Sequence, residues 1–465
     1  MRADSAVAMP QAGGAILRWT VYDVIEVLRG ELVLPFFSTG DARALRMVSQ
    51  RFRRAVLAHI WVDCDTPVLD PRRWARCFPR ARCCRLAEAA RISDWDLHLL
   101  RGVTWLSCFG SHSAQFTDVG MAELRGVRHL DLQNSSVALS DRGLLHLPVI
   151  ETLRFVARGM TDAGLGSIRS VRTLEFEGDA DITDRGLAAL GPQLRELCIG
   201  PALGVGFTDA GVCAIGAGLV RLCLVNLAVV LTDSALLSLP SLQELSISSC
   251  PRVQITNRGI AALAHVTTLS FTELDGLVAD DAGFMCLGGL EKLHLCSCQR
   301  ASITDVTFAA LSRLHILTIS DCAGLNVTDA GFIALARVGT IDFSWNRHAR
   351  FQISEGGVAA LQTVGLIDMT DTGIYFTVAE RTQLESRGAR AHVDLWADDL
   401  SWESDSESHE DLLAFANGLE DDYYDEAQFG FEEAELGFED GAQHPEAQHP
   451  EAQAQDPPES FNIDE

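Results

Sequence analysis

The sequence contains almost no lysine: Lys292 is the one lysine among its 37 basic residues, and the others are arginines. No apolar run reaches the ~18 residues of a membrane-spanning helix, which excludes such a helix. The opening residues, MRADSAVAMPQAGG, lack the charged and then apolar pattern of a secretion signal. We therefore expect an intracellular protein, cytoplasmic or nuclear, whose 13 cysteines are reduced thiols.

Acidic residues outnumber basic ones, and the excess lies in one segment. The chain of 465 residues has 64 acidic side chains and a net charge of −27, but 23 of these acids lie within 398–465, which has no Lys or Arg. The remainder carries 41 acids against 37 bases, a net charge of −4. This balance argues against nucleic acid or an anionic membrane as the main partner. Hydrophobic residues make up 47% of the chain, which is ample for a core.

A Thr/Ser-Asp-x-Gly signature recurs through the middle of the chain. Its acidic position falls at Asp94, Asp118, Asp141, Asp162, Asp184, Asp209, Asp233, Asn257, Asp281, Asp305, Asp329 and Glu355. The mean period is about 24 residues, inside the range of leucine-rich repeats. The Thr or Ser can cap a helix, and the Asp lies in its first turn, where the helix dipole favours negative charge.

A short strand follows each helix-like segment, with apolar residues two positions apart, as in Leu130/Leu132 and Leu197/Ile199. No unit can bury its apolar face alone, so stacked units must share a continuous core. Because helices are wider than strands, we expect a curved α/β solenoid with a parallel sheet on the concave face and helices outside.

These units resemble the cysteine-containing leucine-rich repeats. Cys250, Cys298 and Cys322 follow their strands where that family places its cysteine. The resemblance covers roughly 90–396, although Ala235 and Thr307 replace the signature glycine. A last signature, beginning at Thr370, is expected to start a shortened closing unit that ends on the strand AHVDLW.

The segment 16–61 is amphipathic and resembles an F-box, despite Arg29 in place of the usual proline. F-boxes bind the adaptor Skp1 through a helical bundle. The resemblance implies that the adaptor-binding residues are Leu28, Glu31, Leu32, Phe36, Asp41, Leu45, Val48 and Phe52. The alternative is a plain helical cap that covers the open end of the solenoid.

Binding is expected on the concave face, because solenoid strands present side chains there over a long surface. The residue between each apolar pair should point to that face. The candidates are Asp131, Arg154, Glu175, Ser246, Ser270, His294, Thr318, Asp342 and Asp368, together with Cys198 and Cys223. No single-sign stripe identifies a ligand, so a protein surface or peptide is the expected partner. The alternative is ordinary solvated strand.

The sequence offers little support for an enzymatic or a metal-binding function. His294, Cys296 and Cys298 could share a strand face as soft metal ligands, but Cys298 lies at the repeat's own cysteine position. No phosphate-binding loop, nucleophile elbow or kinase signature is present. We therefore expect no enzyme, cofactor or metal. The arginines of 62–90 form either a basic docking surface or, more simply, a solvated face.

The expected organisation is a flexible N-terminus (1–15), an F-box-like domain (16–61), a linker with a first capping unit (62–90), the solenoid (91–396) and a disordered acidic tail (397–465). The resemblance implies a substrate-recognition adaptor of a Skp1–cullin ubiquitin ligase. A stand-alone repeat scaffold, or an effector acting in a host cytoplasm, remains the alternative. Neither the substrate nor the oligomeric state follows from the sequence.

Overall fold

A computed structural model describes residues 7–9, 17–19, 38–48, 50–361 and 364–395. By its internal contacts the chain divides into Met1–His409 and Glu410–Glu465, and all described residues belong to the first unit. The predicted tail, 397–465, lies outside the described residues, and so do Leu28, Glu31, Leu32 and Phe36. Among the described helices, none is long and apolar enough to cross a membrane.

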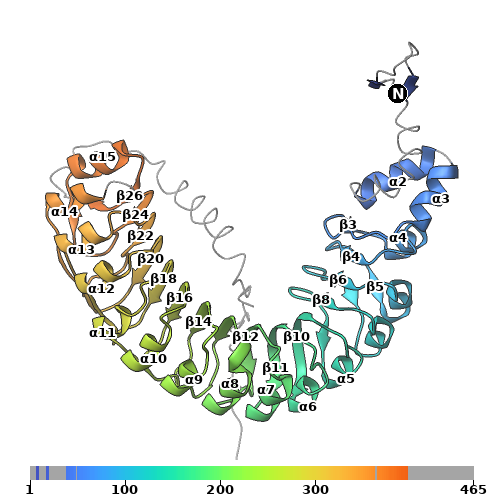
Figure 1. Cartoon of the computed structure of the whole chain (residues 1–465), viewed down its shortest axis with the longest axis horizontal. Coiled ribbons are helices and arrows are strands. Elements are labelled where there is room, and N and C mark those ends of the chain that lie inside the picture. The colour runs from blue at the N-terminus through green and yellow to red at the C-terminus, as the bar shows by residue number, and fades with distance from the viewer. Residues whose placement is uncertain (1–6, 10–16, 20–37, 49, 362–363, 396–465) are drawn as a thin grey trace, which may run out of the picture. The chain divides into compact units, whose positions relative to one another are not determined.

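One parallel sheet runs through the whole repeat array (Figure 1). Its strands in spatial order are β3 (Pro67–Val68), β4 (Cys83–Leu86), β6 (Trp105–Ser107), β8 (His129–Asp131), β10 (Thr152–Thr161), β11 (Thr173–Asp181), β12 (Glu196–Leu203), β13 (Arg221–Val225), β14 (Glu244–Ser248), β16 (Thr268–Thr272), β18 (Lys292–Cys296), β20 (Ile316–Ser320), β22 (Thr340–Asp342), β24 (Leu366–Asp368) and β26 (Arg390–His392). The parallel sheet predicted from the alternating apolar residues is confirmed. The segment 62–90 contributes β3 and β4 to this same sheet.

Shorter strands lie between the main strands and the helices. They are β5 (Ile92–Ser93), β7 (Ala114–Gln115), β9 (Ala138–Leu139), β15 (Ile255–Thr256), β17 (Leu277–Val278), β19 (Ser302–Thr304), β21 (Gly324–Thr328), β23 (Arg350–Gln352), β25 (Tyr375–Phe376) and β27 (Asp394–Leu395). Strand β9 pairs in parallel with the middle of β10 in the main sheet, and the others pair in parallel with equivalent strands of neighbouring units. A separate antiparallel pair joins β1 (Val7–Met9) and β2 (Leu17–Trp19).

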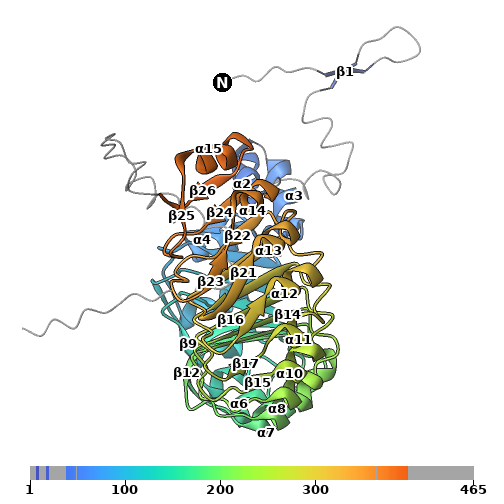
Figure 2. The ribbon, with the colours of Figure 1, turned by 90° about the vertical axis from the view of Figure 1, so that its left-hand side faces the viewer.

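Short helices line the outer side of the array, opposite the sheet (Figures 1 and 2). They are α4 (Pro71–Cys77), α5 (Asp141–Leu144), α6 (Asp162–Leu165), α7 (Asp184–Leu190), α8 (Asp209–Ile215), α9 (Asp233–Leu237), α10 (Asn257–Ala262), α11 (Asp281–Phe284), α12 (Asp305–Ala310), α13 (Asp329–Ala334), α14 (Glu355–Ala360) and α15 (Val378–Ser386), with 3-10 helices η2 (Asp94–Leu100), η3 (Gly120–Leu124) and η4 (Gly216–Gly218). The predicted caps are present: the hydroxyl of Thr183, for example, accepts a hydrogen bond from the Arg185 backbone N–H at 3.3 Å.

A continuous apolar core fills the space between sheet and helices, from Val68 to Ala391. Cys298 lies in this core, fully buried, and its thiol donates to the carbonyl oxygen of Phe271 at 3.5 Å. At the corresponding place in a later unit, Asn346 accepts from the Cys322 backbone N–H at 2.8 Å. In these units the position holds a polar side chain that hydrogen-bonds the backbone of the strand turn, whereas Leu227 and Leu274 occupy it in others.

The signature aspartate joins each unit to the next one, a role that the sequence analysis missed. Its carboxylate accepts from the backbone N–H of the following unit's cap residue at 2.7–3.0 Å, and from that residue's hydroxyl at 2.5–2.9 Å. The donors are Thr117 for Asp94, Ser140 for Asp118, Thr161 for Asp141, Thr183 for Asp162, Thr208 for Asp184, Thr232 for Asp209, Thr256 for Asp233, Thr304 for Asp281, Thr328 for Asp305 and Ser354 for Asp329.

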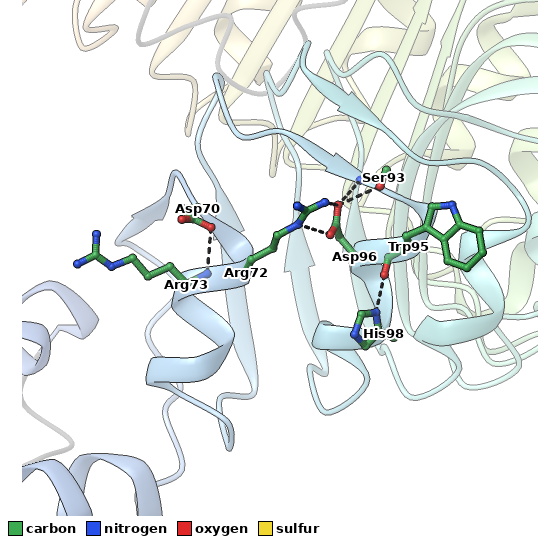
Figure 3. A network of polar contacts seen from close by, with 7 residues as sticks. All are labelled: Asp70, Arg72, Arg73, Ser93, Trp95, Asp96 and His98. Carbon is green, nitrogen blue, oxygen red and sulfur yellow. Dashed lines mark hydrogen bonds and ion pairs between the residues drawn. The ribbon is translucent and has the colours of Figure 1, made fainter.

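The signature glycine leaves room for that carboxylate. A Cβ atom built at nine of these glycines would lie 2.2–2.8 Å from the Oδ1 atom of the preceding unit's Asp or Asn. The unit that begins at Asp94 differs, because a carboxylate, that of Asp96, occupies its glycine position. Asp96 pairs with Arg72 of α4, in the preceding segment (Figure 3). The carboxylate of one unit therefore packs and hydrogen-bonds against the start of the helix in the next unit.

One boundary prediction is wrong. The signature that begins at Thr370 does not start a helix, because Asp371 adopts a left-handed φ of 57° in the turn after β24. Helix α15 begins at Val378 instead, with Thr377 and Glu380 forming a capping box. The predicted end strand is present in part, as β26 and β27. A Thr-Asp-x-Gly sequence suits such a turn as well as a helix start, because Asp tolerates positive φ.

Candidate functional site

The register of the sheet brings all the predicted concave-face residues into one row. Asp131 pairs with Arg154, Arg154 with Glu175, and the pairing continues strand by strand to Asp368. We call this line of 11 residues, from Asp131 to Asp368, the central row. The row also continues to His392 on β26 and to Ser107 and Arg85 on β6 and β4, which the sequence analysis did not include.

Charged side chains occupy the N-terminal end of the central row. The Nε atom of Arg154 lies 3.2 Å from the Oε2 atom of Glu175, and the Gln133 amide donates to Oε1 of Glu175 at 2.6 Å. Burial nevertheless raises the pKa of Glu175 and the pKa of Asp131. Burial and the charge of Glu175 raise the pKa of Glu177 as well. This end is crowded with carboxylates whose charge Arg154, Arg85 and Arg221 neutralise only in part.

Small side chains form the middle of the row. The thiols of Cys198 and Cys223, on adjacent strands, are hydrogen-bonded to each other, which together with burial raises the pKa of Cys198. Ser246 and Ser270 follow, and then His294, whose pKa is lowered by burial. The Nδ1 atom of His294 is buried without a hydrogen-bond partner among the described residues, so this imidazole stays neutral near pH 7.

Two aspartates on adjacent strands close the row at its C-terminal end. Asp342 accepts from the Ser344 backbone N–H at 2.9 Å, and Asp368 accepts from the Thr370 backbone N–H at 3.0 Å. Burial raises the pKa of Asp342 despite its hydrogen bond, and the neighbouring charge of Asp368 adds to this effect. Both ends of the row are therefore acidic and the middle is uncharged.

The three potential metal ligands in and after β18 do not share one face, because the turn after the strand separates Cys298 from His294 and Cys296. Cys298 points into the core and is fully buried, while His294 and Cys296 lie on the strand and are partly exposed. Ser297 between the two cysteines has a left-handed φ of 52°. No group of three or more potential metal ligands forms within the described residues.

The described part of the F-box-like segment is a helical pair, α2 (Thr39–Val48) and α3 (Gln50–Ala58). It carries Asp41, Leu45, Val48 and Phe52 of the predicted adaptor-binding set. The Asp41 backbone N–H donates to the Ser38 hydroxyl at 3.1 Å, which caps the start of α2. Four of the predicted adaptor-binding residues thus come from two consecutive helices.

The helical pair packs against the first unit of the array. Ala42 and Val56 are fully buried in a cluster with Trp61, Phe78 and Ala81. The Trp61 indole N–H donates to the Val56 carbonyl oxygen at 2.9 Å, and its ring centroid lies 5.4 Å from that of Phe78. This cluster fixes α3 to the segment that leads into the sheet.

A single carboxylate, that of Asp63, also joins the pair to the array. It accepts from the backbone N–H of Thr39 at the start of α2, and from the backbone N–H groups of Asp65 and Thr66 at 3.0 and 3.1 Å. Burial acts to raise the pKa of Asp63, but the hydrogen bonds from Thr39 and Thr66 outweigh it and lower the pKa to about 2.

Several arginines predicted as a basic face in 62–90 have local partners. Arg72 forms two hydrogen bonds with Asp96, which also accepts from Ser93, so that α4 is joined to η2 (Figure 3). Arg80 donates to the Ala58 carbonyl oxygen at 2.7 Å, and Arg82 donates to that of Gly102 at 3.0 Å. These contacts are structural, although all three side chains remain exposed.

Comparisons with known proteins find likeness in fold only. No protein-family model matches the chain, and no curated protein matches it. A leucine-rich repeat protein of Leptospira interrogans aligns with a TM-score of 0.47 and 12% identity, covering 69% of this chain and 87% of that one. An internalin of Listeria monocytogenes aligns with a TM-score of 0.45 and 14% identity, covering 71% and 94%. A plant peptide hormone receptor in complex with the peptide RGF2 aligns at 0.35 and 12%, covering 74% and 75%.

The chain's own geometry defines its class. Successive units of about 24 residues each add one parallel strand and one short helix to a shared core. The protein is therefore a leucine-rich repeat solenoid.

Proposed function

We propose that the protein is a recognition subunit that holds a protein partner on the concave face and attaches through α2 and α3 to a Skp1-like adaptor of a cullin ubiquitin ligase. The central row is the observation that carries the first half of this proposal. Its 11 residues stand in register on consecutive strands, between buried residues that make the core. The buried residues form the core, whereas the row residues other than Cys198 and Cys223 keep part of their surface exposed.

The size of the row favours a protein over a small molecule. Ten steps between strands span roughly 48 Å at about 4.8 Å per step. Small-molecule sites are enclosed pockets of about 300–1,000 Å³, whereas solenoids bind proteins and peptides along extended concave surfaces. The acidic ends and the uncharged middle would require a partner whose basic groups lie far apart.

The adaptor half of the proposal is supported by the placement of α2 and α3. The cluster of Val56, Trp61 and Phe78 and the capping carboxylate of Asp63 hold the helical pair on the first unit. Met47 of α2 is 87% exposed, so the pair also presents an apolar side chain to solvent. A rigid link of this kind would place a bound substrate at a fixed distance from the ligase.

A second candidate is a stand-alone scaffold in which α2 and α3 only close the N-terminal end of the array. The burial of Ala42 and Val56 against the first unit favours it, because a capping repeat must cover the exposed core. The two candidates share the concave binding face and differ in what the helical pair contacts.

Co-purification with recombinant Skp1 separates them. The full chain is compared with a Leu32→Asp, Phe52→Asp variant and with a matched control, Leu145→Asp, Leu203→Asp, at two exposed leucines of the array. Binding by the wild type and the control that the first variant loses would support the adaptor. A folded wild type that fails to bind Skp1 would favour the scaffold, and so would equal binding by all three proteins.

The concave face is tested by steric blocking. Ser246→Trp and Ser270→Trp would place bulky side chains in the small middle of the row, whereas Ala309→Trp places one on the exposed side of α12. Partners captured from a lysate should be lost by both serine variants and retained by the control. Retention by all three would show that partners bind elsewhere.

A further inference from the structure

Exposed arginines line the edge of the sheet at which the strands begin, and they are concentrated in the N-terminal half of the array. Along this edge Thr104 follows Arg82, and Arg128, Glu151, Arg172 and Arg195 succeed it one strand at a time, each donating its backbone N–H to the preceding residue's carbonyl oxygen at 2.7–2.8 Å. Further arginines lie in the loops that enter these strands. The full set, which we call the basic edge, is Arg80, Arg82, Arg101, Arg125, Arg128, Arg169, Arg172 and Arg195.

The fold does not require arginine at these positions. The same backbone hydrogen bonds continue the edge through the C-terminal units. There the row is occupied by Val220, Gln243, Thr267, Glu291, His315, Gly339 and Gly365, and an arginine follows at Arg390, where the last strand of the sheet, β26, begins. Ser312 likewise stands in α12's unit where Arg125 stands in that of η3, although Arg313 and Arg337 lie in the loops that enter β20 and β22. Helix C-termini favour cations, but α9, α10 and α11 form with no arginine between the end of the helix and the next strand of the main sheet.

Two ion pairs within the protein show how arginines of the basic edge bind carboxylates. Arg101 forms an ion pair with Glu123 of the next unit, and Arg128 forms one with Glu151 at 2.5 Å. Each pair therefore bridges two neighbouring units along the edge. A guanidinium has five N–H donors, so these pairs and the contacts of Arg82 with carbonyl oxygen leave donors unused.

Part of the basic edge has no carboxylate of its own. The side chains of Arg125 and Arg172 form no hydrogen bond or ion pair with a described residue, although their charges help to lower the pKa of Glu123 and of Glu151, which already pair with Arg101 and Arg128. Arg172 and Arg195 directly precede the adjacent strands β11 and β12, and the Arg195 side chain donates to the Gly218 carbonyl oxygen at 2.8 Å. Like charges in adjacent positions of a sheet are destabilising unless an anion lies between them. Glu151 stands between Arg128 and Arg172 in the row, whereas no acidic residue of the row stands between Arg172 and Arg195.

We propose that the basic edge is a second interaction surface, separate from the concave face, which binds an acidic segment of a polypeptide. One carboxylate of the bound segment would lie between Arg172 and Arg195 and pair with both, in the way that Glu151 pairs with Arg128. A second carboxylate would pair with Arg125. A polypeptide fits better than nucleic acid, because residues 1–397 carry a net charge of −4 and would not attract a uniform polyanion.

The test measures binding of a fluorescently labelled poly-glutamate peptide to the full chain by anisotropy, at low and at physiological salt. Poly-glutamine and oligo-thymidylate of the same length are the comparison probes. The variant Arg125→Ser, Arg169→Ser, Arg172→Thr introduces residue types that the C-terminal units carry at or near the same positions. The control Arg300→Ser, Arg313→Ser, Arg337→Ser removes the same charge from exposed arginines of the C-terminal half.

The wild type should bind poly-glutamate and not poly-glutamine. The basic-edge variant should lose about tenfold in affinity, and the control variant less than about twofold, because each exposed ion pair contributes under about 1 kcal/mol. Equal losses in the two variants, or no binding to poly-glutamate at low salt, would overturn the proposal. Tighter binding of oligo-thymidylate that the same variant loses would instead identify a nucleic-acid surface. Circular dichroism of both variants checks that the array stays folded.

Discussion

The hydroxyl of Thr307 donates a hydrogen bond to the Oδ1 atom of Asp281 at 2.5 Å, in the one described unit where threonine replaces the signature glycine. At the nine signature glycines a side chain would collide with the Asp or Asn of the preceding unit, although Ala235 is accommodated beside Asp209 in another unit. Thr307 is fully buried. Its hydroxyl is a third donor to that carboxylate, in addition to the backbone N–H and the hydroxyl of Thr304. Burial acts to raise the pKa of Asp281, but these hydrogen bonds lower it overall.

Replacing Thr307 by valine should therefore destabilise the array by about 1–3 kcal/mol, the cost of leaving a charged acceptor without its donor. Thr307→Ser keeps the hydroxyl and is the matched control, with an expected cost of about 1 kcal/mol for the lost methyl group. Chemical denaturation of the three proteins measures the difference. Since the folded pKa of Asp281 is lowered, the stability that it contributes is lost as pH falls, so the gap between valine and serine should shrink in acid. Equal costs at neutral pH would show that the hydroxyl contributes nothing.

Gly164 tests whether the signature glycine is needed to leave room for the aspartate of the preceding unit. A Cβ atom at Gly164 would lie 2.2 Å from the Oδ1 atom of Asp141, which accepts from both the backbone N–H and the hydroxyl of Thr161. Gly164→Ala should cost about 1–3 kcal/mol by overpacking. In an Asp141→Ala background the same change should cost less, with a coupling of about 0.5–3 kcal/mol in a double-mutant cycle. Gly126→Ala is the control, because its nearest heavy atom lies at 3.9 Å. Additive costs would mean that Asp141 does not set the need for glycine.

Much of this fold could be predicted from periodicity within one unit. Alternation placed Leu197 and Ile199 in the core, and the threonines before each aspartate were expected as helix caps. The contact of each aspartate with the following unit could not be predicted in this way, because it joins residues about one period apart. A signal was available nonetheless. Two of the three units that depart from glycine, at Asp96 and Thr307, also change what the carboxylate or its neighbour binds, whereas Asp209 keeps its usual contacts beside Ala235.

The central row was predicted residue by residue, because alternation decides which side of a strand each residue faces. Its electrostatics could not be predicted in that way. The pKa of Asp131 depends on burial by neighbouring strands, and the thiols of Cys198 and Cys223 meet only through the sheet register. The basic edge escaped prediction for a similar reason, since Arg128, Arg172 and Arg195 are far apart in sequence and become neighbours only when the units stack.

The anchoring of the helical pair predicts a local effect for Asp63. Asp63→Ala removes the acceptor at the start of α2 and should destabilise the pair by about 1 kcal/mol, the usual value of a helix cap. Hydrogen exchange of α2 and α3 should accelerate while the strands of the array stay protected. Asp65→Ala is the control, because its side chain is exposed and forms no hydrogen bond or ion pair with the described residues. Acceleration spread evenly over the array would indicate that the pair is an inseparable part of the fold.

The same carboxylate predicts how that anchor responds to pH. The folded pKa of Asp63 is about 2, below its ordinary value of 3.8, so the anchor is fully present above pH ~4 and is lost as pH falls toward 2. Exchange in α2 of the wild type, corrected for the intrinsic rate, should accelerate across that window. The Asp63→Ala variant should already be fast at neutral pH and change little.

Asp342 should respond to pH in the opposite sense. Its pKa is raised by burial and by Asp368, so the folded state binds a proton more tightly than the unfolded state does, and stability falls as pH rises through the raised pKa. Asp342→Asn keeps an oxygen acceptor for the Ser344 backbone N–H and removes the buried charge. The variant should therefore be more stable than the wild type at pH 7, by up to about 1 kcal/mol, and the difference should vanish in mild acid. Denaturation at both pH values measures this. A variant less stable than the wild type at pH 7 would mean that the carboxylate has a favourable partner, and that the acidic C-terminal end of the central row is already satisfied without a bound protein.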